Sequence, residues 1–232
     1  MNKLIHTTIV ATALSLGAFA EPGEQMFTKP NSGKGFVAVV NQQTKVDEKE
    51  FTKAVDMLRG YKPYMFKFVK TEAEAKDAAA ILLLVDKAGE PPMTVAPEVG
   101  RAEVNVAGLC ADLKSEEGQK KFLPDRARRE FIRAFAFAFC AGGSQFPGNI
   151  MSATSTRDLD YLKDPLPVDT IEAIGKTAKK RGLEAQHVVD YYTACEEGWA
   201  PKPVTDQQKK DWDEVHQLPT KPIKILPPNQ KK

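Results

Sequence analysis

The residues best placed to do chemistry lie in one stretch, residues 126–152, which reads RARREFIRAFAFAFCAGGSQFPGNIMS. Glu130 lies there among several basic residues, which are Arg126, Arg128, Arg129 and Arg133. A carboxylate can serve as a general base, but guanidinium groups one helical turn away favour its charged form and lower its pKa. We therefore expect Glu130 to be a poor base with a structural role. The arginines either bind an anionic partner in an open cleft or pair with Glu130 and Asp125.

A second group that could react is the thiol of Cys110. A cysteine nucleophile is activated by a neighbouring base, and beyond His6 the chain has two histidines, His187 and His216. Both are distant from Cys110 in the sequence, but such pairs meet in space rather than along the chain. A Cys110–histidine pair therefore stays open as a candidate catalytic site.

Two further groups of candidates lie in the C-terminal third. Four aspartates in and beside one loop either hold calcium through oxygen ligands or form a solvated loop, and their spacing fits no EF-hand. Four aromatic residues either line a groove for a peptide or a glycan or belong to the core. The two groups are Asp158, Asp160, Asp164 and Asp169, and Tyr191, Tyr192, Trp199 and Trp212.

A central helix is expected to position the residues around Glu130. In residues 126–140 the apolar side chains recur at steps of three and four, which predicts a helix that is buried in its second half. Pro124 and Asp125 suit its first turn, where proline loses no hydrogen bond and a carboxylate meets the positive end of the helix dipole. Gly142 and Gly143 are predicted to close the helix in the left-handed conformation.

Short apolar runs before this helix predict β-strands. Met93–Ala96 is expected to be an edge strand, because a central strand would not tolerate Pro97. The predicted strands are 36–40, 64–69, 79–85, 93–96 and 101–109, and a helix capped by Asp47 is predicted to end at Gly60. This order predicts an α/β (α+β) fold, a mixed twisted sheet with a backing helix and a central buried helix, followed by a mostly helical C-terminal subdomain.

After Ser152 the pattern becomes mostly helical, with helices predicted at 168–180, 183–196 and 205–215. The chain is therefore expected to have five parts. These are a signal peptide (1–20), a flexible segment (21–35), an α/β subdomain (36–152), a helical C-terminal subdomain (153–216) and a tail rich in Pro and Lys (217–232).

The first twenty residues are typical of a secretory signal peptide. They contain Lys3, an apolar run and an A-x-A site that ends at Ala20, where cleavage is expected. We therefore expect a secreted or periplasmic protein of about 210 residues, long enough to bury a real core. Without Lys3, the 33 basic residues become 32 against 31 acidic ones, a net charge of +1, which argues against a nucleic-acid partner. No later run has the ~20 apolar residues of a membrane span.

Three cysteines occur in the chain, Cys110, Cys140 and Cys195. In an oxidising compartment, one disulfide and one remaining thiol is the simplest pairing. We predict a bond between Cys140 and Cys195, because it would tie the end of the central helix to the C-terminal helices. The alternative is three buried thiols that pack as small apolar residues.

The order of strands, the buried helix and a following turn, Asn149-Ile150-Met151-Ser152, together resemble the metzincin metallopeptidases. In that family a helix carries the motif HExxHxxGxxH, a methionine turn lies beneath the metal, and a mostly helical lower subdomain completes the cleft. On this chain the motif falls on Arg129, Glu130, Arg133, Ala136 and Phe139, with Met151 at the turn. Every metal ligand is absent, and arginine cannot replace histidine because it stays protonated and has no lone pair to offer.

The resemblance therefore implies a metzincin-like domain without a zinc site and without a cofactor. We expect a non-catalytic binding or structural role in the cell envelope, with an unknown protein, peptide or glycan partner. The alternative is a hydrolase, peptidase-like or other, with a non-standard active site around Glu130. The runs RREFIRAFAFAFCAGGSQFPGNIM and EEGWAPKPVTDQQKKDWDEVHQLPTKPIKI also look like a group of uncharacterised secreted bacterial proteins, a likeness that implies no activity.

Overall fold

The computed structural model describes residues 26–29, 31–42, 44–144, 147–200 and 202–217. The predicted signal peptide and nearly all of the predicted tail lie outside these ranges. The chain divides into two units, a main unit of residues 31–187 and a second unit formed by the residues before and after it. The sequence instead suggested a boundary after residue 152. Residues 153–187 belong to the main unit because their apolar side chains, including Leu159, Ile174 and Leu183, join its core.

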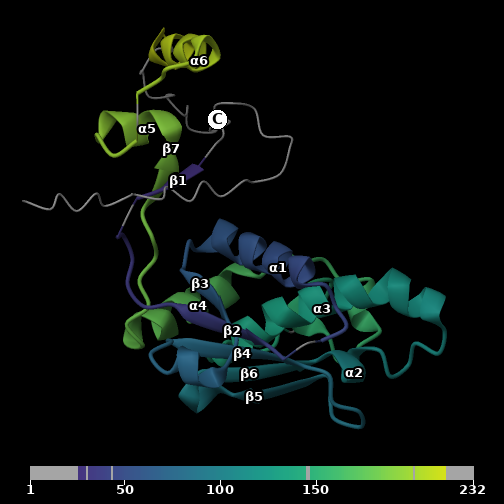
Figure 1. Ribbon diagram of the computed structural model, residues 1–232. Coiled ribbons are helices and arrows are strands. Elements are labelled where there is room, and N and C mark those ends of the chain that lie inside the picture. The colour runs from purple at the N-terminus through teal and green to yellow at the C-terminus, as the bar shows by residue number, and fades with distance from the viewer. Residues whose placement is uncertain (1–25, 30, 43, 145–146, 201, 218–232) are drawn as a thin grey trace, which may run out of the picture. The chain divides into compact units, whose positions relative to one another are not determined.

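A five-stranded mixed sheet forms one layer of the main unit (Figure 1). Its order is β3-β2-β4-β6-β5, in which β2, β3, β4 and β6 run parallel and β5 is antiparallel to β6. The strands are β2 (Val37–Asn41), β3 (Phe66–Val69), β4 (Ala80–Val85), β5 (Met93–Ala96) and β6 (Arg101–Asn105). The predicted α+β class and the edge position of Met93–Ala96 are both confirmed.

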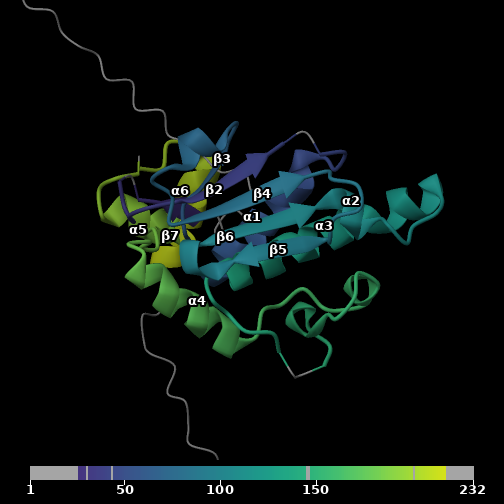
Figure 2. The same ribbon diagram turned by 90° about the horizontal axis from the view of Figure 1, so that it is seen from below.

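Helices α1 (Glu48–Tyr61) and α3 (Glu116–Ala138) lie side by side on one face of this sheet, as Figure 2 also shows. The core between them and the sheet includes Phe51, Phe131 and Leu82, all fully buried. Shorter elements complete the main unit: η1 (Glu72–Ala75), η2 (Pro97–Val99), α2 (Val106–Leu109), η3 (Ile150–Ser152), η4 (Asp158–Asp160) and α4 (Val168–Lys180). Among the described residues, no helix has both the length and the apolar character needed to cross a bilayer.

The second unit contains a two-stranded antiparallel sheet and two helices. Strand β1 (Met26–Thr28) pairs with β7 (Val188–Asp190), and α5 (Tyr191–Glu196) and α6 (Asp206–Gln217) follow. The prediction of a single helix over 183–196 is therefore wrong in its first half. Its β-branched pair, Val188 and Val189, pairs with the segment predicted to be flexible, and a partner so distant in the sequence leaves no local signal.

The central helix begins at Glu116, eight residues before the predicted start at Pro124. Its N-cap is Ser115, whose side-chain oxygen accepts a hydrogen bond from the backbone N–H of Gly118 at 3.1 Å. Pro124 lies inside the helix, where it removes one intrahelical hydrogen bond. The exposed first turns carry no apolar periodicity, so the pattern predicted only the buried part.

The helix ends in a Schellman motif in which the left-handed residue is Cys140, at φ 61°, and neither Gly142 nor Gly143. The N–H of Ala141 donates to the carbonyl of Ala136 at 3.0 Å, and that of Cys140 to Phe137 at 2.9 Å. The predicted glycine cap is therefore wrong. In this left-handed region a residue with a Cβ is less stable than glycine, because its Cβ lies too close to the following carbonyl oxygen.

Cys140→Gly is accordingly expected to raise the free energy of unfolding by about 0.5 kcal/mol, because the relief of about 1–2 kcal/mol exceeds the extra chain entropy of glycine. Urea unfolding of the purified protein measures this. Cys140→Ala is the matched control, since it removes the thiol and keeps the Cβ, and it should give no gain. Equal stabilities of the two variants would contradict the strain argument.

Candidate functional site

The basic residues of α3 face the segment that follows the helix, residues 150–164. Arg126, Arg129 and Arg133 recur at steps of three and four, so they share one side of the helix. The segment that they face contains the two short helices η3 and η4 and packs against α3. This contact is where the family resemblance would place a metal, and it decides what the site can do.

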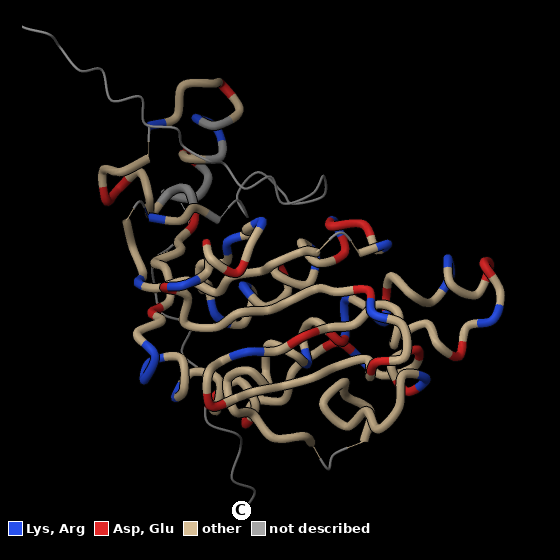
Figure 3. The backbone as a smooth tube through the Cα atoms, turned by 60° about the horizontal axis from the view of Figure 1, so that its bottom comes forward, with Lys and Arg blue, Asp and Glu red and all other residues tan. Residues whose placement is uncertain are grey.

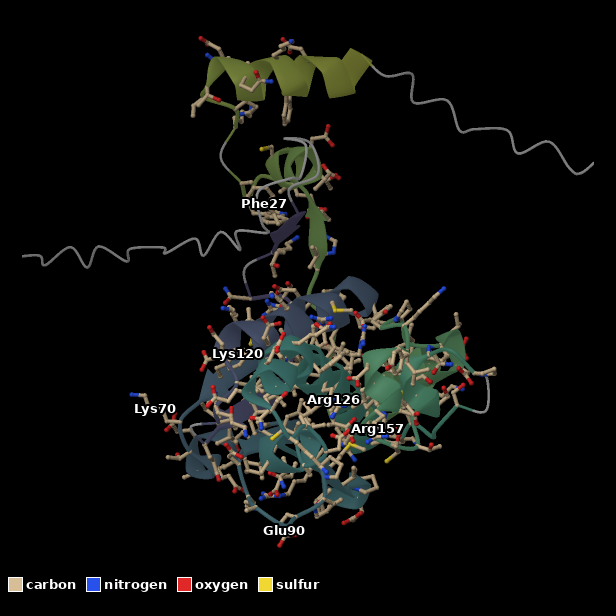
Figure 4. All side chains as sticks on the ribbon, turned by 90° about the vertical axis from the view of Figure 1, so that its right-hand side faces the viewer. Phe27, Lys70, Glu90, Lys120, Arg126 and Arg157 are labelled. Carbon is tan, nitrogen blue, oxygen red and sulfur yellow. The ribbon has the colours of Figure 1, made fainter. Side chains whose placement is uncertain are left out.

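Arg126 is the most buried of these arginines, with 1% of its side chain exposed. Its Nε and Nη2 each donate to the carboxylate of Asp160 at 2.7 Å, and Nη1 donates to Asp112 at 2.6 Å and to the carbonyl of Leu109 at 2.8 Å. Asp112 also accepts from Arg157, which lies near Arg126 in Figure 4. Hydrogen bonding to Asp160 is the main reason that the pKa of Arg126 is raised. This arginine is a fully bonded structural group.

Arg129 and Arg128 hold the same segment further along. Arg129 donates to the carboxylate of Asp164 and to the carbonyl of Leu159. Arg128 lies 2.8 Å from Asp125 and 3.4 Å from Asp164. Of the two alternatives left open for the arginines, pairing with Asp125 is observed for Arg128, and Asp164 is a partner that the sequence did not indicate. An open anion-binding cleft is therefore not what these arginines form.

Glu130 is buried, with 2% of its side chain exposed, and accepts a hydrogen bond from Arg133. Arg133 also donates to the carbonyl of Ala153 at 3.0 Å. Removal from water raises the pKa of Glu130, and this effect is larger than the opposing attraction of Arg133. The expectation of a lowered pKa is thus wrong, because the sequence showed the neighbouring charges and not the burial.

The turn that contains Met151 packs against the same helix. The side chain of Asn149 accepts from the backbone N–H of Met151 at 2.9 Å, which caps η3. Met151 is 2% exposed and belongs to one core cluster with Ala136 and Phe139. Five of the six motif positions lie on α3 or at its C-cap, and the sixth, Met151, lies in η3, which packs against this helix. Four of the six are buried core or buried charge: Glu130, Ala136, Phe139 and Met151.

These residues do not fit zinc. A catalytic zinc site takes imidazole, carboxylate or thiolate ligands at about 2.0–2.3 Å, and the ligand positions here carry Arg129, Arg133 and Phe139. The guanidinium groups already donate to carboxylates and carbonyls. Across the described ranges, no group of three or more His, Cys, Asp or Glu side chains is arranged to hold a metal ion.

The aspartates predicted as a calcium site or a solvated loop form hydrogen bonds with other groups of the protein. Asp160 and Asp164 bind arginines of α3, as described above. Asp158 accepts hydrogen bonds from the backbone N–H groups of Thr154 and Ser155, both at 2.8 Å, which lowers its pKa and closes the turn before η4. The N–H of Thr170 bonds to Asp169 at the start of α4. The cluster serves the fold rather than a cation.

The thiol of Cys110 lies in hydrogen-bond contact with the side chain of Lys45. Its Sγ lies 3.1 Å from Nζ of Lys45 and 3.4 Å from the carbonyl of Ala107. Neither of these two contacts involves a histidine. The side chain of His216 lies outside the description, so a Cys110–His216 pair stays a prediction. Lys45 was not singled out from the sequence, since no spacing rule links residues so far apart.

None of the three cysteines, all of which the structure describes, forms a disulfide. The predicted Cys140–Cys195 bond is therefore not supported, and its two residues fall in different units. Of the aromatic candidates, Trp199 donates its indole N–H to Glu197 at 2.9 Å, and Trp212 is half-buried. The side chains of Tyr191 and Tyr192 lie outside the description.

A surface cavity of about 430 Å³ lies between the loop before α1 and the first half of α3. Its lining includes Lys45, Glu50, Glu116 and Lys120, so both signs of charge are present. Glu130 does not line it. The mixture is typical of the main unit, in which Figure 3 shows acidic and basic residues interspersed along the backbone.

No family model and no curated protein matches the sequence. The solved structures that are similar to it in fold include two from archaea. Archaemetzincin from Methanopyrus kandleri is 13% identical, with a TM-score of 0.47 over 62% of this chain and 96% of the other. A zinc-dependent peptidase from Methanocorpusculum labreanum is 13% identical, with a TM-score of 0.46 over 60% of this chain and all of the other. With identities of 13% and TM-scores below 0.5, these two structures give no information on whether this chain is catalytic.

Proposed function

We propose that this protein is a secreted, metzincin-like domain without zinc catalysis that has a binding or structural role in the cell envelope. One observation carries the proposal. At the two arginine positions of the motif, Arg129 and Arg133 are bonded internally to Asp164, Glu130 and two backbone carbonyls. In this arrangement the motif's ligand positions carry guanidinium groups that are already bonded within the protein, and these groups cannot bind a zinc ion.

The alternative is a hydrolase that uses Glu130. The raised pKa of Glu130 favours it, because a general acid must hold its proton near neutral pH. Its burial and its bond to Arg133 oppose it, since a catalytic acid must reach the substrate within hydrogen-bond distance. The role of Glu130 is better explained as a fold-stabilising partner of Arg133.

The metal content of the purified protein, produced without a histidine tag, tests the proposal. After incubation with zinc and removal of the excess, we expect far less than one zinc per chain by elemental analysis, because the site lacks nitrogen and sulfur ligands. Hydrolysis of casein and of a fluorogenic peptide pool should not exceed the buffer rate. Glu130→Gln keeps the shape of the side chain and should behave in the same way.

Near-stoichiometric zinc would overturn the proposal and direct attention to ligands outside this site. Hydrolysis that disappears in Glu130→Gln would instead establish the alternative. If hydrolysis persisted in that variant, a different catalytic site would be required, and the non-catalytic role would again be wrong.

A further inference from the structure

The contact between Cys110 and Lys45 joins two segments that are 65 residues apart. Lys45 belongs to the loop between β2 and α1, and Cys110 is the C-cap of α2. The 3.1 Å between Nζ and Sγ leaves space for one bridging atom after a small movement. Neither residue has a part in the arginine network of α3.

The surroundings hold both groups in place. The thiol is 8% exposed and lies 3.4 Å from the carbonyl of Ala107, which restricts its rotation. Nζ of Lys45 is also within 3.5 Å of the side-chain oxygen of Gln119, on α3. The loop before α1, the end of α2 and helix α3 therefore together hold the amine close to the sulfur.

A small oxidant can reach the lysine of this pair directly, and Cys110 keeps an exposed fraction of 8%. Lys45 lines the surface cavity of about 430 Å³, whose rim includes the exposed side chains of Lys49, Glu116 and Lys120. Cys140 offers an internal comparison, since its thiol is exposed but lies against Arg181 and the carbonyl of Pro97, at 3.9 and 3.6 Å. A guanidinium group is a far poorer nucleophile than an amine, so Cys140 lacks the second reactive group.

We propose that Cys110 and Lys45 form an oxidative modification site, at which molecular oxygen links the two side chains through one oxygen atom as Nζ–O–Sγ. The thiol, the ammonium group and O₂ give the bridge, one water and one proton. The S–H bond and two N–H bonds break, and N–O and O–S bonds form. Sulfur and nitrogen each lose two electrons, and O₂ takes up all four. Two equivalents of a dithiol supply four electrons and reverse the step.

The bridge has a defined structural consequence. It ties the loop before α1 to the connection between α2 and α3, and it removes the positive charge of Lys45 from the cavity. The oxidised form therefore differs from the reduced form in the charge of the cavity and in the freedom of its rim. This site is independent of the role proposed for the arginine network.

The test compares protein purified without oxygen with the same protein kept in oxygen-saturated buffer. Intact mass spectrometry should show a gain of about 14 Da, one oxygen less two hydrogens, which dithiothreitol removes. Trypsin should fail to cut after Lys45, and a cross-linked peptide containing Lys45 and Cys110 should appear. Cys140→Ser should give the same result, whereas Cys110→Ser and Lys45→Arg should lose the shift.

Several outcomes would overturn the proposal. One is a Cys110 that stays fully alkylatable after oxidation. Another is a gain of about 16 or 32 Da with normal cleavage after Lys45, since this marks sulfenic or sulfinic acid without the bridge. Persistence of the 14 Da shift in Lys45→Arg would also contradict it, because another nitrogen would then be the partner. Circular dichroism spectra matching the parent would show that the variants are folded.

Discussion

Replacement of Asp160 by alanine is expected to lower the free energy of unfolding by about 3 kcal/mol at neutral pH. The reason is that Arg126 would keep its charge in a site where only 1% of its side chain is exposed, while it loses two hydrogen bonds of 2.7 Å. Breaking a buried pair from one side costs about 3–5 kcal/mol. Asp112 and the carbonyl of Leu109 remain as partners, so we expect the lower end of that range. Urea unfolding at pH 7 measures this loss in the free energy of unfolding.

The matched control is Glu184→Ala. Glu184 pairs with Lys34 at 3.1 Å, but the two side chains are 53% and 74% exposed, so the loss should stay below about 1 kcal/mol. The double variant Arg126→Met with Asp160→Leu removes both charges of this pair and should recover part of the stability. Asp112 keeps Arg157 as a partner, whereas the carbonyl of Leu109 loses the bond from Arg126. If Asp160→Ala cost no more than Glu184→Ala, the arginine network would not hold the segment after α3.

Arg133→Met is expected to destabilise the protein by about 3 kcal/mol at pH 7 and by much less near pH 4. At pH 7 the variant leaves Glu130, 2% exposed, without its ionic partner. Burial already raises the folded-state pKa of Glu130, and loss of the attraction of Arg133 raises it further. The folded state therefore binds a proton more tightly than the unfolded state, in which a glutamate titrates near about 4.3.

The sign of the pH dependence follows from this difference. Below the unfolded pKa both states are protonated and the full stability is present; as pH rises towards the folded pKa, stability falls. Urea unfolding from pH 4 to pH 8 should therefore show a deficit in Arg133→Met that grows with pH. Carboxylates such as Asp112, whose pKa Arg126 lowers, have the opposite dependence, but they are common to wild type and variant and cancel in the difference.

The double variant Arg133→Met with Glu130→Gln supplies the control, because it has no carboxyl group at this position. Its stability relative to wild type should lack the growing deficit at high pH. A deficit in Arg133→Met that is the same at every pH would show that lost packing, and not a buried charge, causes the effect. In that case Glu130 and Arg133 would not act as an ion pair.

Local patterns in the sequence determined much of this protein. The apolar β-branched runs predicted the strands of the main sheet, except that residues 106–109, predicted as strand, form α2. Pro97 indicated that Met93–Ala96 lies at an edge, and the steps of three and four in residues 126–140 predicted the buried part of α3. The absence of zinc ligands at the motif positions is equally a property of the sequence. These features depend on residue type and short spacing, which the printed chain contains in full.

The tertiary structure alone determines which groups pair within the site and how deeply they are buried. The carboxylates that bind Arg126 and Arg129 belong to Asp112, Asp160 and Asp164, which are 14 to 35 residues away, and no periodicity links them to α3. The raised pKa of Glu130 arises because desolvation depends on every element packed around the side chain and not on its neighbours in the sequence. The contact of Lys45 with Cys110 has the same origin. Burial and electrostatic pairing are properties of the assembled core, which is why spacing along the chain could not predict them.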